Sequence, residues 1–296
     1  MALPRFPALS AALLTLALAG PVALAAEDAA QSTRAYVETS YLIAPHQVGE
    51  FKLIQTSYDP DNKYSGPGFR YQSQVHPEVR VDVYVYPAGR MEQAYALDTG
   101  MQGFHADLAR AVDAGVYSDL VVEEAAFALA DKVQADALET AGDSDDPFAA
   151  LLLAAEQEES HPEGRKLSMT LLAQPGGQAM HSAGYLAYRQ LYFFKLRASV
   201  LQDTIETAPF HAFADRAART LLPAIEAAHV GDCANSTLTI NPDASAEDMA
   251  IALVKHSTRQ LGYNCHLDAE AAGIAAKSAQ ADVIDIHYEP QEWSAQ

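Results

Sequence analysis

The chain has 296 residues, 49% of them hydrophobic, with 14 Tyr and 10 Phe, so it can bury the core of one large domain or two smaller ones. Its 39 Asp and Glu outnumber its 19 Lys and Arg, which gives a formal net charge of −20. This charge repels the phosphate backbone of nucleic acids and anionic lipid surfaces. We therefore exclude nucleic acid as a partner.

The first 25 residues predict a cleaved secretory signal peptide. Arg5 and the amino terminus form a positive region, residues 8–19 are uncharged and rich in Leu and Ala, and residues 23–25 have the small-x-small pattern of a cleavage site. The apolar stretch is too short to span a bilayer. We expect a periplasmic or secreted protein that begins at Ala26 and is not stably inserted in a membrane after signal cleavage.

Cys233 and Cys265 are the only two cysteines. In an exported protein an isolated pair predicts a structural disulfide. The bond would close a loop of about 30 residues and stabilise the fold by about 3–4 kcal/mol in the chain-entropy model.

Residues 51–115 predict three strands followed by a helix. In the third strand, Val81, Val83 and Val85 alternate with polar residues, which indicates one buried and one polar face. The helix has apolar residues at spacings of three or four, and Gly115 predicts its end. The strands are expected at 51–58, 69–75 and 80–86, and the helix at 97–112.

The same order of elements recurs in the second half of the chain. A strand is predicted at 166–173, two aromatic-rich strands within 184–200, and a helix at 207–229. Between the two sets, the Ala-rich segment 123–133 favours a helix, and Asp146-Pro147 predicts the start of another. An antiparallel sheet packed with helices, arranged as a βββα repeat, is the expected α+β fold.

The remainder of the chain predicts a small αβ unit. A short strand is expected at 237–240, a helix that is capped by Ser245 and ends at Gly262, a second helix at 272–279 and a strand at 282–288. The predicted domains are the signal peptide at 1–25, an α+β sandwich at 26–230 and a disulfide-tied C-terminal unit at 231–296.

Two segments resemble the PsbP-like α/β/α sandwich family. One is Gly68-Phe69-Arg70-Tyr71 with the strand 81–85, and the other is the strand 191–198 that leads into a Phe-rich helix. The resemblance covers residues 51–229 and transfers no catalytic motif. It implies a non-enzymatic binding or assembly scaffold, although fold alone does not determine function.

The usual catalytic motifs fail in this sequence. Ser182 has the second half of a nucleophile elbow, but Met180 occupies the position where the strained turn needs Gly. There is no His-Glu-x-x-His and no phosphate-cradling glycine loop. We expect no catalytic residue, no metal and no cofactor.

One group of polar residues on the predicted strands is a candidate ligand site. In the second hairpin, the polar residues Tyr185, Arg189, Lys195 and Arg197 all have odd numbers, so simple alternation would place them on one face of the sheet. The first hairpin contributes the residues that alternate with the valines: Arg80, Asp82, Tyr84 and Tyr86. Arginine forks and aromatic rings can hold a carboxylate or a sugar, so the proposed ligand-binding residues are Tyr84, Tyr86, Tyr185, Arg189 and Arg197. The alternative is that sheet tyrosines and arginine stems only cover core edges.

These observations favour a non-catalytic binding or interaction protein of the cell envelope. Its partner would be an envelope protein or a small polar ligand. The alternative is a periplasmic hydrolase whose site is assembled from scattered residues. A deep pocket holding paired carboxylates, or a Ser/His pair at hydrogen-bond distance, would favour the enzyme, and a shallow aromatic face would favour binding.

Overall fold

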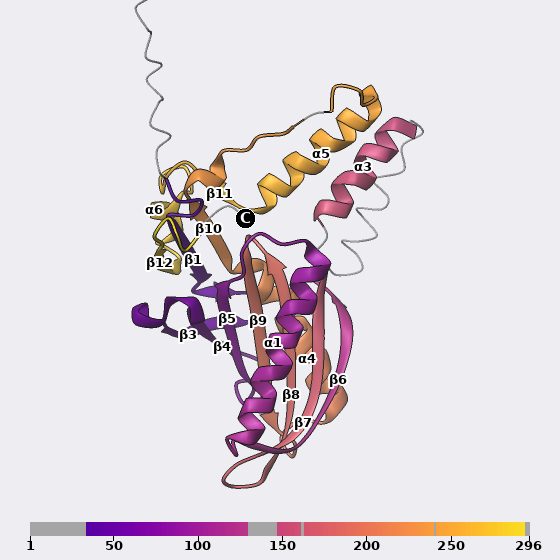
Figure 1. The fold of residues 1–296 in the computed structure, drawn as a ribbon. Helices are drawn as coiled ribbons and strands as arrows, with labels where there is room; N and C mark the ends of the chain where they lie inside the picture. Colours follow the sequence, from indigo (N-terminus) through magenta and orange to yellow (C-terminus); the bar gives the residue numbers. More distant parts are fainter. Residues whose placement is uncertain (1–33, 130–146, 161–162, 240, 294–296) are drawn as a thin grey trace, which may run out of the picture. The chain divides into compact units, whose positions relative to one another are not determined.

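The computed structural model describes residues 34–129, 147–160, 163–239 and 241–293 (Figure 1). The predicted signal peptide lies outside the described residues. No helix among the described residues is long and apolar enough to cross a membrane.

An eight-stranded antiparallel sheet is the largest element, with the strand order β2-β3-β4-β5-β9-β8-β7-β6. The third strands of the two predicted sets, β5 and β9, pair with each other in the middle of this sheet. The strands are β2 (Gln47–Val48), β3 (Phe51–Ser57), β4 (Gly68–Ser73), β5 (Arg80–Pro87), β6 (Tyr117–Ala128), β7 (Glu163–Ala173), β8 (Gln178–Arg189) and β9 (Tyr192–Leu201).

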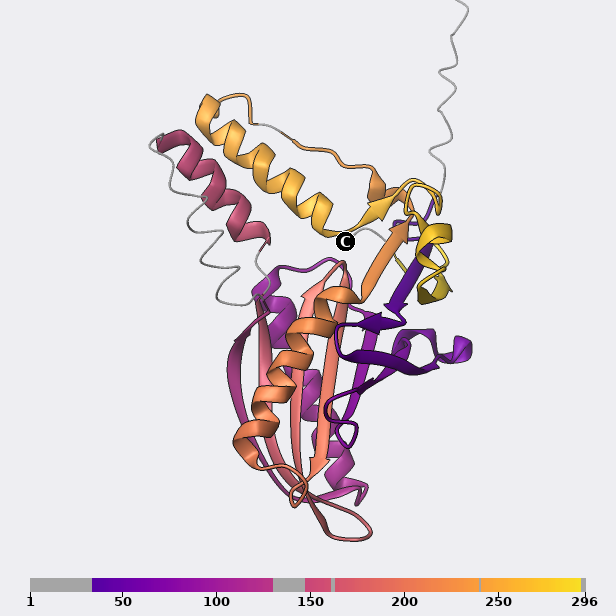
Figure 2. The ribbon, with the colours of Figure 1, turned by 180° about the vertical axis from the view of Figure 1, so that it is seen from behind.

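The two faces of this sheet are covered by different helices, α1 (Gln93–Asp113) and α4 (Thr207–Ala224), as Figures 1 and 2 show from opposite sides. Helix α1 packs Leu97, Met101 and Phe104 on the β6–β8 half, where Gly184 leaves room for the Phe104 ring. Helix α4 buries seven side chains at helical spacing against the opposite face: Phe210, Phe213, Ala214, Ala217, Ala218, Leu221 and Leu222. The predicted antiparallel α+β fold is therefore confirmed.

A second sheet of four strands has the order β11-β10-β1-β12. Its strands are β1 (Thr39–Pro45), β10 (Glu226–Val230), β11 (Cys265–His266) and β12 (Ala281–His287). Strand β1 lies between β10 and β12, so an early segment of the chain completes a sheet formed by late ones. The predicted domain boundary after residue 230 falls inside this sheet.

The remaining helices belong mostly to the C-terminal part of the chain. Helix α5 (Ala246–Gly262) begins where the Ser245 hydroxyl accepts from the Asp248 N–H at 3.0 Å, the predicted cap. It lies beside α3 (Pro147–Ser160), which starts at the predicted proline. The short elements are η1 (Pro60–Ser65), η2 (Asp232–Ala234) and α6 (Ile274–Lys277).

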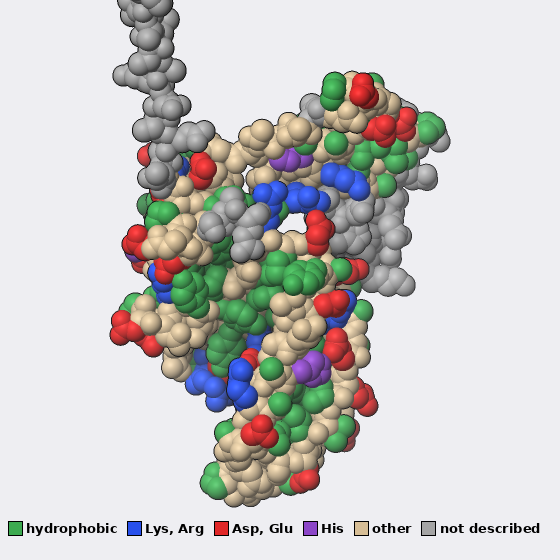
Figure 3. Space-filling model, in the orientation of Figure 1, with side chains coloured by type: hydrophobic (Ala, Val, Ile, Leu, Met, Phe, Trp, Pro, Cys, Tyr) green, Lys and Arg blue, Asp and Glu red, His purple; other side chains and the backbone are tan. Residues whose placement is uncertain are grey.

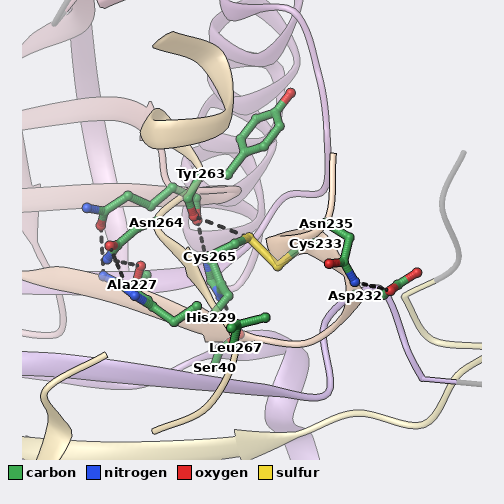
Figure 4. The surroundings of a disulfide bond; sticks show 12 residues. Ser40, Ala227, His229, Asp232, Cys233, Asn235, Tyr263, Asn264, Cys265 and Leu267 are labelled. Carbon is green, nitrogen blue, oxygen red and sulfur yellow. Dashed lines mark hydrogen bonds between the residues drawn. A yellow bond between two sulfur atoms is a disulfide. The ribbon is translucent and has the colours of Figure 1, made fainter. Parts of the chain in front are cut away.

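The predicted disulfide between Cys233 and Cys265 is present (Figure 4). It joins η2 to β11, and Cys265 lies opposite His229 in the parallel pairing of β10 with β11. The bond therefore holds β11 beside the most deeply buried imidazole of the second sheet.

Three predicted elements are wrong. Residues 123–128 belong to strand β6, because pairing with β7 overrides the helical preference of an Ala-rich stretch, and residues 130–133 lie outside the described part. The helix predicted to residue 229 ends at Ala224, and the chain continues as the buried strand β10. Residues 237–239 form no strand, and residue 240 lies outside the described part.

Candidate functional site

The structure divides the five predicted site residues between the two faces of the large sheet. Tyr84, Tyr86 and Arg197 lie on the α1 side, whereas Tyr185 and Arg189 lie on the α4 side. Tyr86 is half-buried and packs against Phe193, with ring centroids 5.5 Å apart. The expectation that all five converge on one face is therefore wrong.

The register of the β8–β9 hairpin explains this error. Its two-residue turn places Arg189 opposite Tyr192, so Tyr185 faces Leu196 and Gly184 faces Arg197. Residues of equal parity on the two strands consequently point to opposite faces. Both turn residues, Gln190 and Leu191, have positive φ, a conformation usual for Asn-Gly, so the sequence carries no sign of such a tight turn.

Tyr185 is a structural residue beneath α4. Its side chain is fully buried, and its hydroxyl donates to Asp215 Oδ1 at 2.5 Å. The Lys166 ammonium donates to the same oxygen, also at 2.5 Å. Burial is the main cause that raises the pKa of Tyr185, and the hydrogen bond to Asp215 is the second. The hydroxyl therefore stays protonated and ties β8 to α4.

Arg189 caps the C-terminus of α4. Its Nη2 donates to the carbonyl oxygens of Ile225 at 2.5 Å and Pro223 at 3.2 Å, and the guanidinium lies 4.8 Å from the centroid of the Phe194 ring. A cation at this end of a helix satisfies carbonyls that lack helical partners. Burial lowers the pKa of Arg189 to about 10, so it remains charged at neutral pH.

On the opposite face, two arginines share one carboxylate. Arg70 Nε donates to Asp82 Oδ1 at 2.7 Å, and Arg80 Nε donates to Asp82 Oδ2 at 2.5 Å. Arg70, Asp82 and Arg197 lie in register on three adjacent strands, β4, β5 and β9. We call the group of Arg70, Arg80, Asp82, Tyr84 and Arg197 the arginine face.

Arg197 brings a third guanidinium to this face without a carboxylate of its own among the described residues. It donates to the Tyr117 hydroxyl at 2.6 Å and to the Ser182 hydroxyl at 3.1 Å. Beside it, Lys195 pairs with Asp107 at 2.9 Å. Figure 3 shows Lys and Arg side chains gathered over β4 and β5, beside α1. The arginine face therefore has three guanidinium groups and one carboxylate.

A hollow with a volume of about 580 Å³ lies at the end of β5. It lies between the β5–α1 loop, η1, Tyr36 and the segment 291–293. We call it the aromatic pocket because four aromatic side chains line it, namely Tyr36, Tyr64, Tyr95 and Trp293. Tyr64 and Tyr95 are 53% and 65% exposed, whereas Trp293 is buried, so the pocket has aromatic residues both at its floor and in solvent.

The lining of the aromatic pocket has one positive charge that no carboxylate of the described residues neutralises. Glu292 accepts hydrogen bonds from Lys63 Nζ and the Tyr64 hydroxyl, both at 2.7 Å. These contacts lower the pKa of Glu292 to about 2, and the bond from Lys63 has the largest effect. Lys63 thereby neutralises this carboxylate. Arg90 lies 5.7 Å from the Tyr263 ring centroid and has no carboxylate partner in the described parts of the chain. Arg90 is thus available to an anionic ligand.

The loop that carries Arg90 is held in place before any ligand arrives. The Leu191 carbonyl accepts from the backbone N–H groups of Ala88 and Gly89 at 3.0 and 3.1 Å. The Tyr188 hydroxyl donates to the Gly89 carbonyl at 2.8 Å and accepts from the Met91 N–H at 3.1 Å. The same lining includes the buried hydroxyl of Tyr36, which has no hydrogen-bond partner among the described residues.

A Ser/His pair at hydrogen-bond distance is also present, but it is sealed inside the protein. The Gln190 carbonyl lies 2.6 Å from His229 Nε2 and can only accept, so Nε2 carries the proton and Nδ1 accepts from the Ser40 hydroxyl at 2.8 Å. Ser40 and His229 both have zero exposure. Burial lowers the pKa of His229 to about 4. No substrate can reach this pair, so it does not support a hydrolase.

The serine that the sequence offered as a nucleophile is also inaccessible. Ser182 is fully buried and bonds Ser199 and Arg197. No group of three or more His, Cys, Asp or Glu side chains within the described ranges could hold a metal ion. The aromatic pocket was not predicted from the sequence, where Trp293, the single tryptophan, is the one residue that could have pointed to it.

No family model matches the chain, and no curated protein sequence matches it. The geometry of the two sites therefore carries the functional argument.

Proposed function

We propose that this protein is a non-catalytic binding protein of the cell envelope, periplasmic or secreted, whose aromatic pocket holds a small organic anion with a planar or apolar body. The observation that carries this proposal is the pocket of about 580 Å³ with four aromatic side chains and one cation that lacks a carboxylate partner among the described residues. Ligand pockets of this size combine apolar walls with a few placed polar groups.

Each part of the lining has a counterpart in such a ligand. The aromatic side chains pack against a ring or hydrocarbon body. Arg90 provides two N–H groups in a fork that matches a carboxylate. The Tyr36 hydroxyl, whose pKa is raised by burial, stays protonated and can donate one further hydrogen bond.

Two further observations support binding over hydrolysis. The Ser40–His229 pair is inaccessible, and the described polar residues of the pocket are Arg, Gln, Tyr and an ion-paired Glu, which orient ligands. The resemblance to the PsbP-like family, which implies a non-enzymatic scaffold, agrees with this choice.

Trp293 makes the proposal testable by fluorescence, because the only tryptophan lines the pocket. The experiment titrates a panel of ring-bearing carboxylates, with 4-hydroxybenzoate as the first probe and the neutral 4-hydroxybenzamide as its matched control. We expect a saturable change in Trp293 emission for a carboxylate, at least tenfold weaker binding of the amide and of Arg90→Gln, and full recovery of unchanged ligand. A panel without effect, or conversion of a bound member to product, would overturn the proposal.

Export is tested separately by mass spectrometry of the protein that leaves the cytoplasm. The mature chain is expected to begin at Ala26, after the small-x-small pattern at 23–25. Retention of the full-length chain in the cytoplasm would contradict the proposed location.

A further inference from the structure

We infer that the arginine face is a second binding site, distinct from the aromatic pocket, and that its ligand is a carboxylated saccharide such as a short oligouronate. This inference does not depend on the pocket, since it rests on a different set of side chains on the middle of β4, β5 and β9.

The first argument is the charge balance of the face. Among the described residues, Asp82 is the only carboxylate that pairs with Arg70 or Arg80, and Arg197 pairs with none. Asp82 engages the Nε atoms of both neighbours, and these bonds fix the planes of the two guanidinium groups. Three guanidiniums around one carboxylate leave two positive charges on this face, so it attracts an anion although the protein has a net charge of −20.

The second argument is the spacing of the cations. Arg70 and Arg197 lie on the two strands that flank β5, which places their backbones about 10 Å apart at the usual distance between strands. Arg80 lies two residues before Asp82 on β5, about 7 Å along the strand. A chain of acidic units can place a separate carboxylate at each of these cations, which lie on three adjacent strands.

The third argument is the presence of an aromatic surface and uncharged hydrogen-bonding groups. Tyr84 is 37% exposed, and its ring lies over Gly68, where an added Cβ would come within 3.3 Å of the ring. Gln55 accepts from Arg70 Nη1 through its oxygen at 3.1 Å, so its amide N–H groups remain for a ligand. A saccharide ring presents an apolar face to Tyr84 and hydroxyls to Gln55 and Ser57, which line a small hollow beside Asp82.

The fourth argument is access. Helix α1 packs on β6, β7 and β8, while Tyr84 and Arg80 beside it remain exposed. Lys195 closes the boundary with α1, where its ammonium lies 3.9 Å from the Phe104 ring centroid and pairs with Asp107. The face is therefore bounded on one side by a helix and open over the arginines (Figure 3).

Calorimetric titration of the full chain with tetragalacturonate tests this inference, with neutral galactotetraose as the matched control. We expect the uronate to bind and the neutral saccharide to show at least tenfold lower affinity. Raising the salt concentration is expected to weaken uronate binding, because exposed charges carry the contact. Equal affinity for both saccharides, or tighter binding of a poly-glutamate peptide than of the uronate, would overturn the inference.

Variants assign the binding to individual side chains. Arg80→Gln and Arg70→Gln are each expected to weaken uronate binding at least tenfold, and Arg80→Lys to give an intermediate loss, since it keeps the charge but not the fork. Arg216→Gln is the matched control, because Arg216 is an exposed arginine of α4 on the opposite face. Unchanged binding in Arg80→Gln and Arg70→Gln would overturn the inference, as would its loss in Arg90→Gln alone, which would assign the uronate to the aromatic pocket.

Discussion

Two polar regions of the molecule contain similar residue types but differ in how their donors are paired. At the β8–β9 turn, a group that we call the hairpin cluster comprises Ser40, Arg189, Gln190, Tyr192 and His229. Most of its donors find acceptors within the protein, mainly backbone carbonyls and the Tyr288 hydroxyl, and Arg189 Nε is the buried donor of the cluster without a partner among the described residues. On the arginine face, three guanidinium groups share one carboxylate. The supply of internal acceptors, and not the residue type, distinguishes a structural Tyr/Arg group from a binding site.

Removing the disulfide, which lies beside the hairpin cluster, is expected to cause the largest loss of stability. In Cys233→Ser/Cys265→Ser, the free energy of unfolding is expected to fall by about 3–4 kcal/mol, because a loop of 32 residues is no longer closed in the unfolded chain. Urea unfolding without reductant measures this loss in the free energy of unfolding. Tetragalacturonate affinity is expected to stay within twofold, and an equal loss of affinity and stability would contradict the separation of the two regions.

Acid is expected to weaken the hairpin cluster through His229. The unfolded histidine has a pKa of about 6.5. The buried one has a pKa lowered to about 4, because burial disfavours the charged form. Between these values the unfolded chain binds a proton and the folded chain does not, so the free energy of unfolding falls by about 3 kcal/mol as the pH drops from 6.5 to 4.

Urea unfolding at a series of pH values, compared with His229→Gln, measures this contribution. The variant is expected to be less stable at pH 7, where it loses the bonds to Ser40 and Gln190, and to depend less steeply on pH. Identical slopes for the two proteins would show that other groups cause the acid sensitivity.

Arg189→Met is expected to lower the free energy of unfolding by about 2 kcal/mol, because the carbonyls of Pro223 and Ile225 lose their charged donor. The methionine preserves much of the packing against Phe194, so the loss reports the hydrogen bonds. A change below about 0.5 kcal/mol would place Arg189 with the exposed arginines and weaken the comparison.

The smallest expected effect on stability is that of Arg80→Gln, below about 0.5 kcal/mol, because its side chain is 58% exposed. Its uronate affinity is nevertheless expected to fall at least tenfold. Chemical unfolding and calorimetry on the same preparation give both numbers. A large loss of stability would show that the Arg80–Asp82 pair is structural.

The sequence predicted the fold where local patterns and packing agree. The alternating valines of β5, the apolar spacing of α1 and the Ser245 cap all correspond to observed elements. It failed at β6 and β10, because pairing with distant strands determines the conformation of both segments. No local pattern reports such partners.

The candidate site was predicted in part, for a similar reason. Alternation correctly placed Tyr84 on the polar side of β5, and Arg197 joins it there. It misplaced Tyr185 and Arg189 relative to Arg197, because the turn at Gln190 determines the register and has no recognisable turn sequence. The aromatic pocket collects residues from 36 to 293, and its assembly follows only from the tertiary fold.

The position of β1 between β10 and β12 has a consequence for the order of folding. Leu42 has its partners at Ala227 and Ile284, far along the chain, so closing this sheet requires very long loops. The hairpins β3–β5 and β7–β9 join neighbouring segments and can form early. During synthesis, β1 has no partner until β10 has emerged, and its second partner, β12, follows only with residues 281–287. The four-stranded sheet is therefore expected to form last, and the protein reaches its native state only when β12 pairs with β1.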